Sequence, residues 1–239
     1  MMADSIYAIL DLLSIGGWIL IGIAGMILRD ILKDAKSESS KLRWSMMYLI
    51  LPLLLLYPTF LFYQYLFGGD VPLSKSVVTS LTILMAIGSL LLLYLAHQVR
   101  LLQLRRELSG VAASLIVAYL GLSVYLSFQL SDFGDVLNNL LFTTAMMMLS
   151  LSMFYFANYA LAFSKVVHVS RMLYIAGVMM LLPGVVNAFV FENRLLNLFP
   201  HPIFLKIIGT IGILSAGMLM FIAGDKFKQR VLEFDVRLK

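Results

Sequence analysis

Charged residues are scarce in this chain, and that scarcity is the first constraint on what the protein can be. Only 13% of the 239 residues are Asp, Glu, Lys or Arg, whereas 61% are hydrophobic. A soluble domain is about one quarter charged, because its surface has to be hydrated. The chain has too few charges to cover a water-facing surface, so we expect one membrane domain and no soluble domain.

Cysteine is absent and histidine is rare, which removes several chemistries. Without cysteine there are no disulfides, no thiolate-held metal centres and no cysteine nucleophiles. His97, His168 and His201 all stand near the ends of apolar segments, so no two can hold haem or a metal ion within a membrane. We therefore expect no cofactor and no metal site.

Motifs of catalysis and of nucleotide binding are also missing. The sequence has no Gly-x-Ser-x-Gly elbow, no HExxH and no nucleotide-binding glycine loop. Its net charge of +5 is no sign of nucleic-acid binding, since the basic residues stand at the ends of apolar segments. We expect a protein that is not an enzyme and does not bind nucleic acid.

Long apolar segments fill most of the chain. Each exceeds the roughly 18 residues that a transmembrane helix needs, and lipid excludes open strands. We predict an all-α polytopic membrane protein, with a seven-helix domain over residues 1–224 and a short basic amphipathic tail over 225–239. The fifth span is the longest and is expected to tilt or to project at its inner end. The predicted spans are Ile6–Leu28, Ser45–Phe67, Leu73–Ala96, Gly110–Leu130, Val136–Phe163, Met172–Phe191 and Ile203–Ala223.

The basic residues fix the orientation of these spans. In this arrangement of spans, nearly all of the 18 lysines and arginines fall on one side of the membrane. The exceptions are Lys75, Arg194 and Lys206. Short loops rich in Lys and Arg stay in the cytoplasm. We predict a multi-pass protein of the cell membrane with its N-terminus outside and its C-terminus in the cytoplasm. The first span begins without a basic residue, so we expect it to be retained rather than cleaved.

Two ionisable residues are predicted to lie inside the membrane, near its outer surface. Asp11 stands a few residues into the first span and Lys206 a few residues into the last. Both spans are rich in small residues, which allow helices to approach closely. We predict that these spans pack together and that Asp11 pairs with Lys206. The pair is either a gate or ion site, or a structural ion pair, or else two side chains that reach the interface separately.

Prolines mark a second candidate site. Pro58 in the second span and Pro183 in the sixth each remove a helical hydrogen bond and can free a carbonyl to face a cavity. Gln64 and Asn187 stand nearby at comparable outer depth, together with three tyrosines. These residues predict an outward-opening polar pocket for a small molecule between spans two, six and seven. Kinked helices joined by amide hydrogen bonds, with no ligand, are the alternative.

When the sequence is aligned with itself so that Pro58 matches Pro183, spans one to three align with spans five to seven. This repeat predicts the three-plus-one-plus-three helix arrangement of some transporters. Small sugar transporters share this outline, but their Pro-Gln signature is missing here. Microbial rhodopsins share the span number and orientation. Their mid-helix lysine and facing carboxylate are missing too, because Lys206 is near a helix end and the third span has no acidic residue.

The tail places Phe227, Val231, Phe234 and Leu238 at helical spacing with charges between them, although residues 232–239 also alternate like a strand. It is a solvated anchor, lies on the anionic inner leaflet, or docks a partner.

Two functions remain open. One is a receptor-like sensor or an accessory subunit of a larger membrane complex. Such a protein would contact the lipid bilayer and either a protein partner or a second copy of itself, through its helix faces. The other is a small-solute or ion-coupled transporter.

Overall fold

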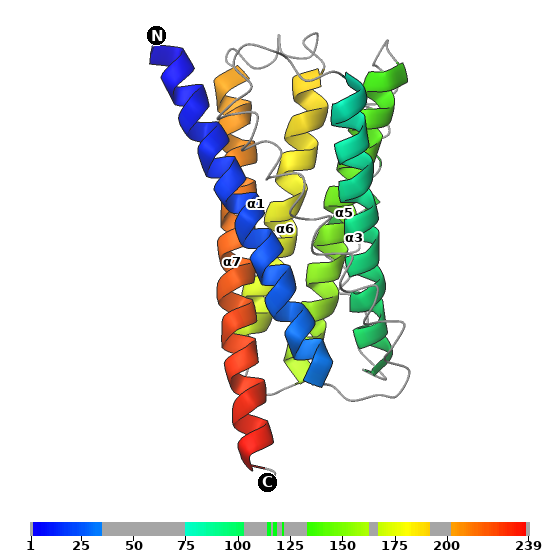
Figure 1. The fold of residues 1–239 in the computed structure, drawn as a ribbon, viewed down its shortest axis with the longest axis vertical. Coiled ribbons are helices and arrows are strands. Elements are labelled where there is room, and N and C mark those ends of the chain that lie inside the picture. Colours follow the sequence, from blue (N-terminus) through cyan, green and yellow to red (C-terminus); the bar gives the residue numbers. More distant parts are fainter. Residues whose placement is uncertain are drawn as a thin grey trace.

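The structure, a computed structural model, describes residues 2–34, 75–102, 114–115, 117–118, 121, 133–162, 167–191 and 202–237. These residues are helical throughout, and five continuous helices form an elongated bundle (Figure 1). The helices are α1 (Met2–Asp34), α3 (Lys75–Leu102), α5 (Phe133–Ala162), α6 (Val167–Phe191) and α7 (Pro202–Arg237).

Four of these helices are long and apolar enough to cross a membrane. Their apolar stretches are Ala8–Ile27, Val136–Leu161, Val167–Gly184 and Ile203–Gln229, and α3 carries a shorter one, Thr79–Tyr94. The described part is therefore all-helical and built like a membrane protein, as predicted. The predicted span Ser45–Phe67 and most of Gly110–Leu130 lie outside the described residues, so the number of seven spans stays a prediction.

The described helices do not all run in the same direction. In Figure 1, α1, α3, α5 and α7 run one way and α6 runs the other way, so the two termini lie at opposite ends of the bundle. Most described basic residues consequently stand at the end of the bundle where α7 finishes, and Lys75 and Lys206 stand at the other end. We call these the C-terminal and N-terminal ends of the bundle. Which end faces the cytoplasm follows from the charge pattern and stays a prediction.

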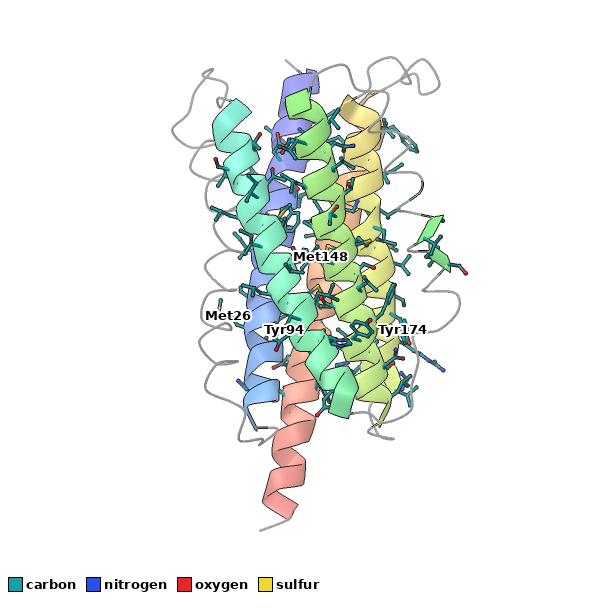
Figure 2. The ribbon with its side chains drawn as sticks, turned by 90° about the vertical axis from the view of Figure 1, so that its right-hand side faces the viewer. Met26, Tyr94, Met148 and Tyr174 are labelled. Atoms are coloured by element: carbon teal, nitrogen blue, oxygen red, sulfur yellow. The ribbon has the colours of Figure 1, made fainter. Side chains whose placement is uncertain are left out.

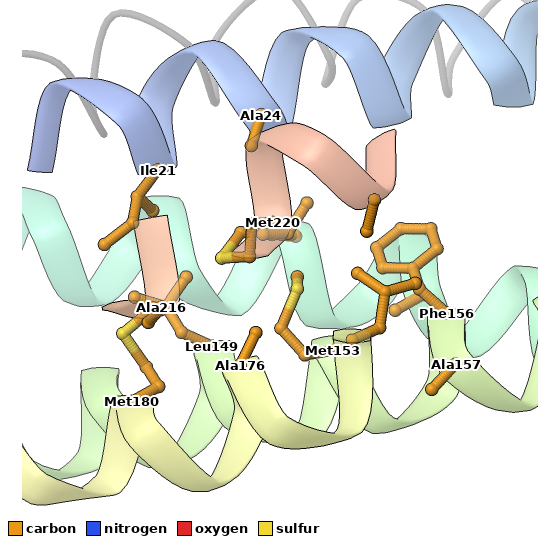
Figure 3. Close-up of a cluster of buried hydrophobic side chains, with 14 of the residues drawn as sticks. Ile21, Ala24, Leu149, Met153, Phe156, Ala157, Ala176, Met180, Ala216 and Met220 are labelled. Atoms are coloured by element: carbon orange, nitrogen blue, oxygen red, sulfur yellow. The ribbon is translucent and has the colours of Figure 1, made fainter. Parts of the chain in front are cut away.

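The core is built from residues at heptad spacing. The neighbouring pairs are α1 and α7, α7 and α6, α6 and α5, and α5 and α3. In α6 the buried residues Val169, Leu173, Ala176 and Met180 follow in steps of four, three and four. This spacing is typical of left-handed helix packing. Figure 3 shows methionines and alanines of α5, α6 and α7 filling the space between the helices.

In α3, large apolar side chains are exposed while two hydroxyl side chains are buried beside the apolar core residues. Its buried residues include Thr82 and Ser89, whereas Ile83, Ile87 and Leu90 are exposed. Water would oppose this arrangement, because it leaves apolar side chains in contact with solvent. Lipid favours it, because small hydroxyl side chains are satisfied inside the bundle: the Ser89 hydroxyl donates to the Met85 carbonyl at 2.8 Å. This arrangement supports a membrane protein.

Within the described residues, the apolar stretch of α7 is slightly longer than that of α5. The α7 stretch has 27 residues and the α5 stretch has 26, while the predicted end of the fifth span at Phe163 lies outside the described residues. It is α7 that projects beyond the other helices, at the C-terminal end of the bundle (Figures 1 and 2). The helix continues unbroken through Arg237, which excludes the strand alternative for residues 232–237. The predicted boundary at residue 224 falls within this helix.

Candidate functional site

The structure brings Asp11 and Lys206 together. Lys206 Nζ lies 2.8 Å from Asp11 Oδ1, and the side chains are 33% and 48% exposed, respectively. Both residues stand near the start of the apolar stretches of α1 and α7, which run in the same direction, so they reach the same depth. The predicted ion pair is thus present. A role as a gate or ion site stays a prediction.

Glycines bring the backbones of α1 and α7 into contact just below this ion pair. A Cβ atom at Gly217 would lie 2.5 Å from the carbonyl oxygen of Gly17. A Cβ atom at Gly17 would lie 2.9 Å from the Cα atom of Leu214. Any side chain at either position would therefore push the helices apart. The predicted packing of these two helices is confirmed.

This close contact explains how a partly exposed ion pair is held in place. Ion pairs of this exposure contribute about 0–1 kcal/mol, because water competes for both charges. The glycine contact fixes the two helices, and the Thr210 hydroxyl donates weakly to the Leu10 carbonyl at 3.5 Å. The position of α1 along α7 is therefore set mainly by the glycine contact, and the ion pair contributes little to it.

Pro183 lies buried inside α6 and leaves the carbonyl of Met179 without its helical hydrogen bond. A carbonyl freed in this way can face a cavity or be covered by a neighbouring helix. In the structure α7 covers the Met179 carbonyl: a Cβ atom at Gly212 would lie 3.0 Å from the Met179 oxygen and 3.1 Å from Pro183 Cδ. The close approach is possible because Gly212 has no side chain. At this depth α6 and α7 are closed against each other.

The other members of the predicted pocket are not placed. Pro58, Gln64 and the three tyrosines lie outside the described residues, and so does the side chain of Asn187, whose backbone is part of α6. Pro183 is thus the member of this set whose side chain the structure describes, and the pocket stays a prediction.

Sequence reasoning missed the polar contacts between α5 and α6. The Ser150 hydroxyl donates to the Gly177 carbonyl at 2.7 Å, and the Tyr174 hydroxyl donates to Asn158 Oδ1. Tyr174 also lies against Phe154, with 5.6 Å between the ring centroids (Figure 2). Hydroxyl and amide side chains in apolar helices are a signal for such contacts.

An aromatic contact holds α7 where it leaves the bundle. Phe227 is 1% exposed and meets Tyr159 of α5 edge to face, with 5.8 Å between the ring centroids. Just beyond it, Gln229 Nε2 donates to Asp225 Oδ2 at 2.9 Å on the exposed side of the helix. Phe227 therefore marks the last buried anchor of α7 that the structure describes.

Within the described residues no group of His, Asp and Glu side chains is arranged to hold a metal ion. Comparison of the chain with protein-family models, with curated proteins and with solved structures found no match. The functional argument consequently depends on the geometry of the chain itself.

Proposed function

We propose that the protein is a non-catalytic integral membrane protein, either a receptor-like sensor or an accessory subunit of a larger membrane complex. The observation that carries this proposal is the length and continuity of α7. Its 36 residues extend about 54 Å at 1.5 Å per residue, whereas the hydrocarbon core of a bilayer is about 30 Å thick. One helix thus connects the ion pair at the N-terminal end of the bundle with a projecting segment at the C-terminal end.

Close packing supports the idea that α7 transmits a displacement. Gly217 packs against the backbone of α1 at Gly17, and Gly212 packs against α6 at the Met179 carbonyl and the Pro183 ring. A helix held in this way moves as a rigid element, so a change at Lys206 also shifts the projecting segment. A sensor needs this property, and a subunit docked on the projecting segment would respond to it.

The character of the core favours this class over transport. Among the residues that the structure describes, the buried set includes no Asp, Glu, Lys or Arg. Ion-coupled transporters carry such residues near the middle of the membrane. Here the middle of the bundle holds Met153, Met180 and Met220 packed among alanines (Figure 3).

A small-solute or ion-coupled transporter with three-plus-one-plus-three helices is the second candidate. Pro183 favours it, because a proline buried in a spanning helix is a feature of helices that open around a substrate. The cover that Gly212 forms over Met179 argues against an open site at that depth. The candidate accordingly needs the pocket formed with Gln64 and Asn187.

Purification of the full chain from its native membrane in mild detergent, followed by mass determination, tests the proposal. We expect a stoichiometric protein partner, and we expect a chain lacking residues 230–239 to remain folded but to lose that partner. Reconstitution of the protein alone into proteoliposomes is the complementary experiment. Saturable solute uptake there, abolished by Gln64→Ala, would replace the sensor or subunit proposal with the transporter.

A further inference from the structure

We propose that the N-terminal end of the bundle binds a small zwitterion, a molecule of the size of a free amino acid that carries one ammonium and one carboxylate group. The site is formed by four residues that we call the polar layer: Asp11, Thr82, Asn139 and Lys206. The inference rests on the proposed function and deepens it, because it names the class of ligand to which a receptor-like sensor would respond. It does not depend on which end of the bundle faces the cytoplasm.

The four residues of the polar layer stand at corresponding depths in four helices. Each of them lies three residues beyond the start of an apolar stretch, which is about 4.5 Å along the helix. Those stretches, in α1, α3, α5 and α7, begin at Ala8, Thr79, Val136 and Ile203. The four helices run in the same direction (Figure 1), so their apolar stretches begin at the same end of the bundle. The polar residues therefore form one layer across it.

This layer belongs to the inward sides of the helices. Residues seven apart, or two turns, share a side of a helix. Seven residues beyond the members of the polar layer, the four helices carry buried residues, namely Trp18, Ser89, Met146 and Ile213. Thr82 and Asn139 are themselves buried, with 2% and 0% exposed. The layer is thus the outermost level of the core, and it is polar where the levels below it are mainly apolar.

The charged members of the layer are accessible from the N-terminal end of the bundle. Asp11 and Lys206 are partly exposed although they stand on the inward sides of their helices. The sides of α1 and α7 that face away from the core carry exposed apolar residues instead, among them Leu12 and Ile211. Below the layer, Trp18 and other residues of the apolar core close the bundle. A ligand consequently reaches the layer from the end of the bundle and stops there, as a sensor requires.

The two charges favour a ligand that carries both signs. Lys206 Nζ lies 2.8 Å from Asp11 Oδ1, so the site has one positive and one negative group and no net charge. A ligand with a single charge would draw one partner away and leave the other without its counter-ion. A zwitterion offers its carboxylate to Lys206 and its ammonium to Asp11, so both charges stay compensated when the pair opens. Opening is easy because water already competes for a pair of this exposure.

An amide on α5 adds a hydrogen-bond acceptor at the same depth. Asn138 Oδ1 is buried, and no described residue donates a hydrogen bond to it. Asn138 directly precedes Asn139 of the polar layer. A buried carbonyl oxygen without a donor is unfavourable, so a ligand N–H group that reaches it is favoured. The amide therefore supports a ligand with an ammonium group over one that carries a carboxylate alone.

Titration of the full chain in nanodiscs with free amino acids, one at a time, tests the inference through the thermal unfolding of the protein. We expect at least one amino acid to raise the unfolding temperature in a saturable manner. Its decarboxylated amine and its deaminated acid, which keep the same side chain, should each bind at least about tenfold more weakly, a difference of about 1.4 kcal/mol. Stabilisation by none of the amino acids, or equal binding of the amine or of the acid, would overturn the inference.

Neutral variants identify the residues that bind. Asp11→Asn and Lys206→Gln should each weaken the binding of that amino acid at least about tenfold. The matched controls are Asp225→Asn and Lys226→Gln, exposed at the other end of α7, and both should bind as the unaltered chain does. Unfolding without ligand shows that each variant is folded. Unchanged affinity in Asp11→Asn or in Lys206→Gln would contradict a site at the polar layer.

These outcomes are separable from those of the proposed function. If a protein partner co-purifies and no amino acid binds, the subunit function stands and the zwitterion inference fails. If an amino acid binds at the polar layer but proteoliposomes take it up and no partner co-purifies, the inference survives and the proposed function fails.

Discussion

The two best-described helix contacts of the bundle are made in different ways. The contact of α1 with α7 depends on Gly17 and Gly217, which lack side chains and let the two backbones meet. The ion pair of Asp11 with Lys206 lies toward one end of this contact. The contact of α5 with α6 depends on hydrogen bonds from Ser150 and Tyr174 that cross between the helices. In lipid there is no hydrophobic force between apolar helices, so close packing and polar contacts take its place. The first pair relies mainly on close packing and the second mainly on hydrogen bonds, although each also has a contact of the other kind. The Thr210 hydroxyl of α7 donates to the Leu10 carbonyl of α1, and a Cβ atom at Gly177 of α6 would lie 3.1 Å from the Ser150 carbonyl oxygen of α5.

The largest effect is expected at the glycine contact. Gly217→Val should destabilise the bundle by about 3 kcal/mol, because a side chain there meets the backbone of α1, which cannot move aside locally. The measurement is unfolding in detergent followed by circular dichroism. Gly16→Val is the matched control, since a Cβ atom at Gly16 has nothing within 4 Å. Equal losses in the two variants would contradict the glycine contact.

An intermediate effect is expected where α7 covers Pro183. Gly212→Ala should cost about 1–2 kcal/mol, since the added methyl group meets both the Met179 carbonyl and the proline ring. Gly209→Ala should cost less, because its closest contact is a Val186 methyl group at 3.3 Å, which can shift. The same unfolding measurement compares them. A larger loss for Gly209→Ala would show that the proline region is not the tight point between α6 and α7.

A smaller effect is expected for the hydrogen bonds of α5 and α6. Ser150→Ala should cost about 0.6 kcal/mol, the average for such bonds in membranes, and at most about 1.7. Ser152→Ala is the control, because its hydroxyl donates to the Met148 carbonyl of its own helix at 2.7 Å. Thermal unfolding in one detergent should rank Ser150→Ala below Ser152→Ala. The reverse order would mean that the bond to Gly177 does not join the helices.

The smallest effect is expected at the ion pair. Asp11→Lys and Lys206→Asp should each lower the unfolding free energy by about 0.2–0.5 kcal/mol, given the exposure of both side chains. The double variant should recover most of this loss, since it restores opposite charges at the same separation. Unfolding at low and at high salt checks the result. A double variant that is no better than the single ones would show that the two charges do not interact.

Sequence reasoning succeeded where position alone decides the contact. Asp11 and Lys206 stand at matching depth in helices that run in the same direction, and glycines cluster beside both, so their pairing was predictable. It failed where the direction of a side chain determines which helix that side chain bonds to. Ser150 and Ser152 are two residues apart in the same apolar run, yet one bonds across to α6 and the other back to its own helix. No periodicity in the sequence distinguishes them.

The surroundings of Pro183 were not predictable for a related reason. A freed carbonyl can be identified from the sequence, since Pro183 fixes which oxygen loses its partner. What meets that oxygen depends on the register between α6 and α7, which a single chain without aligned relatives does not reveal. The sequence shows only that the last span is rich in small residues, and the contact of Gly212 with Met179 is visible only in the structure.

The adjacency of the first and last helices has a consequence for biosynthesis. The ribosome delivers Gly17 first, and the surface that covers it, around Leu214 and Gly217, emerges about 200 residues later. Until then α1 has no backbone to meet at that position and depends on its apolar side chains to stay inserted. A product that stops before α7 would thus lack the helix that covers Gly17 and the partner charge of Asp11.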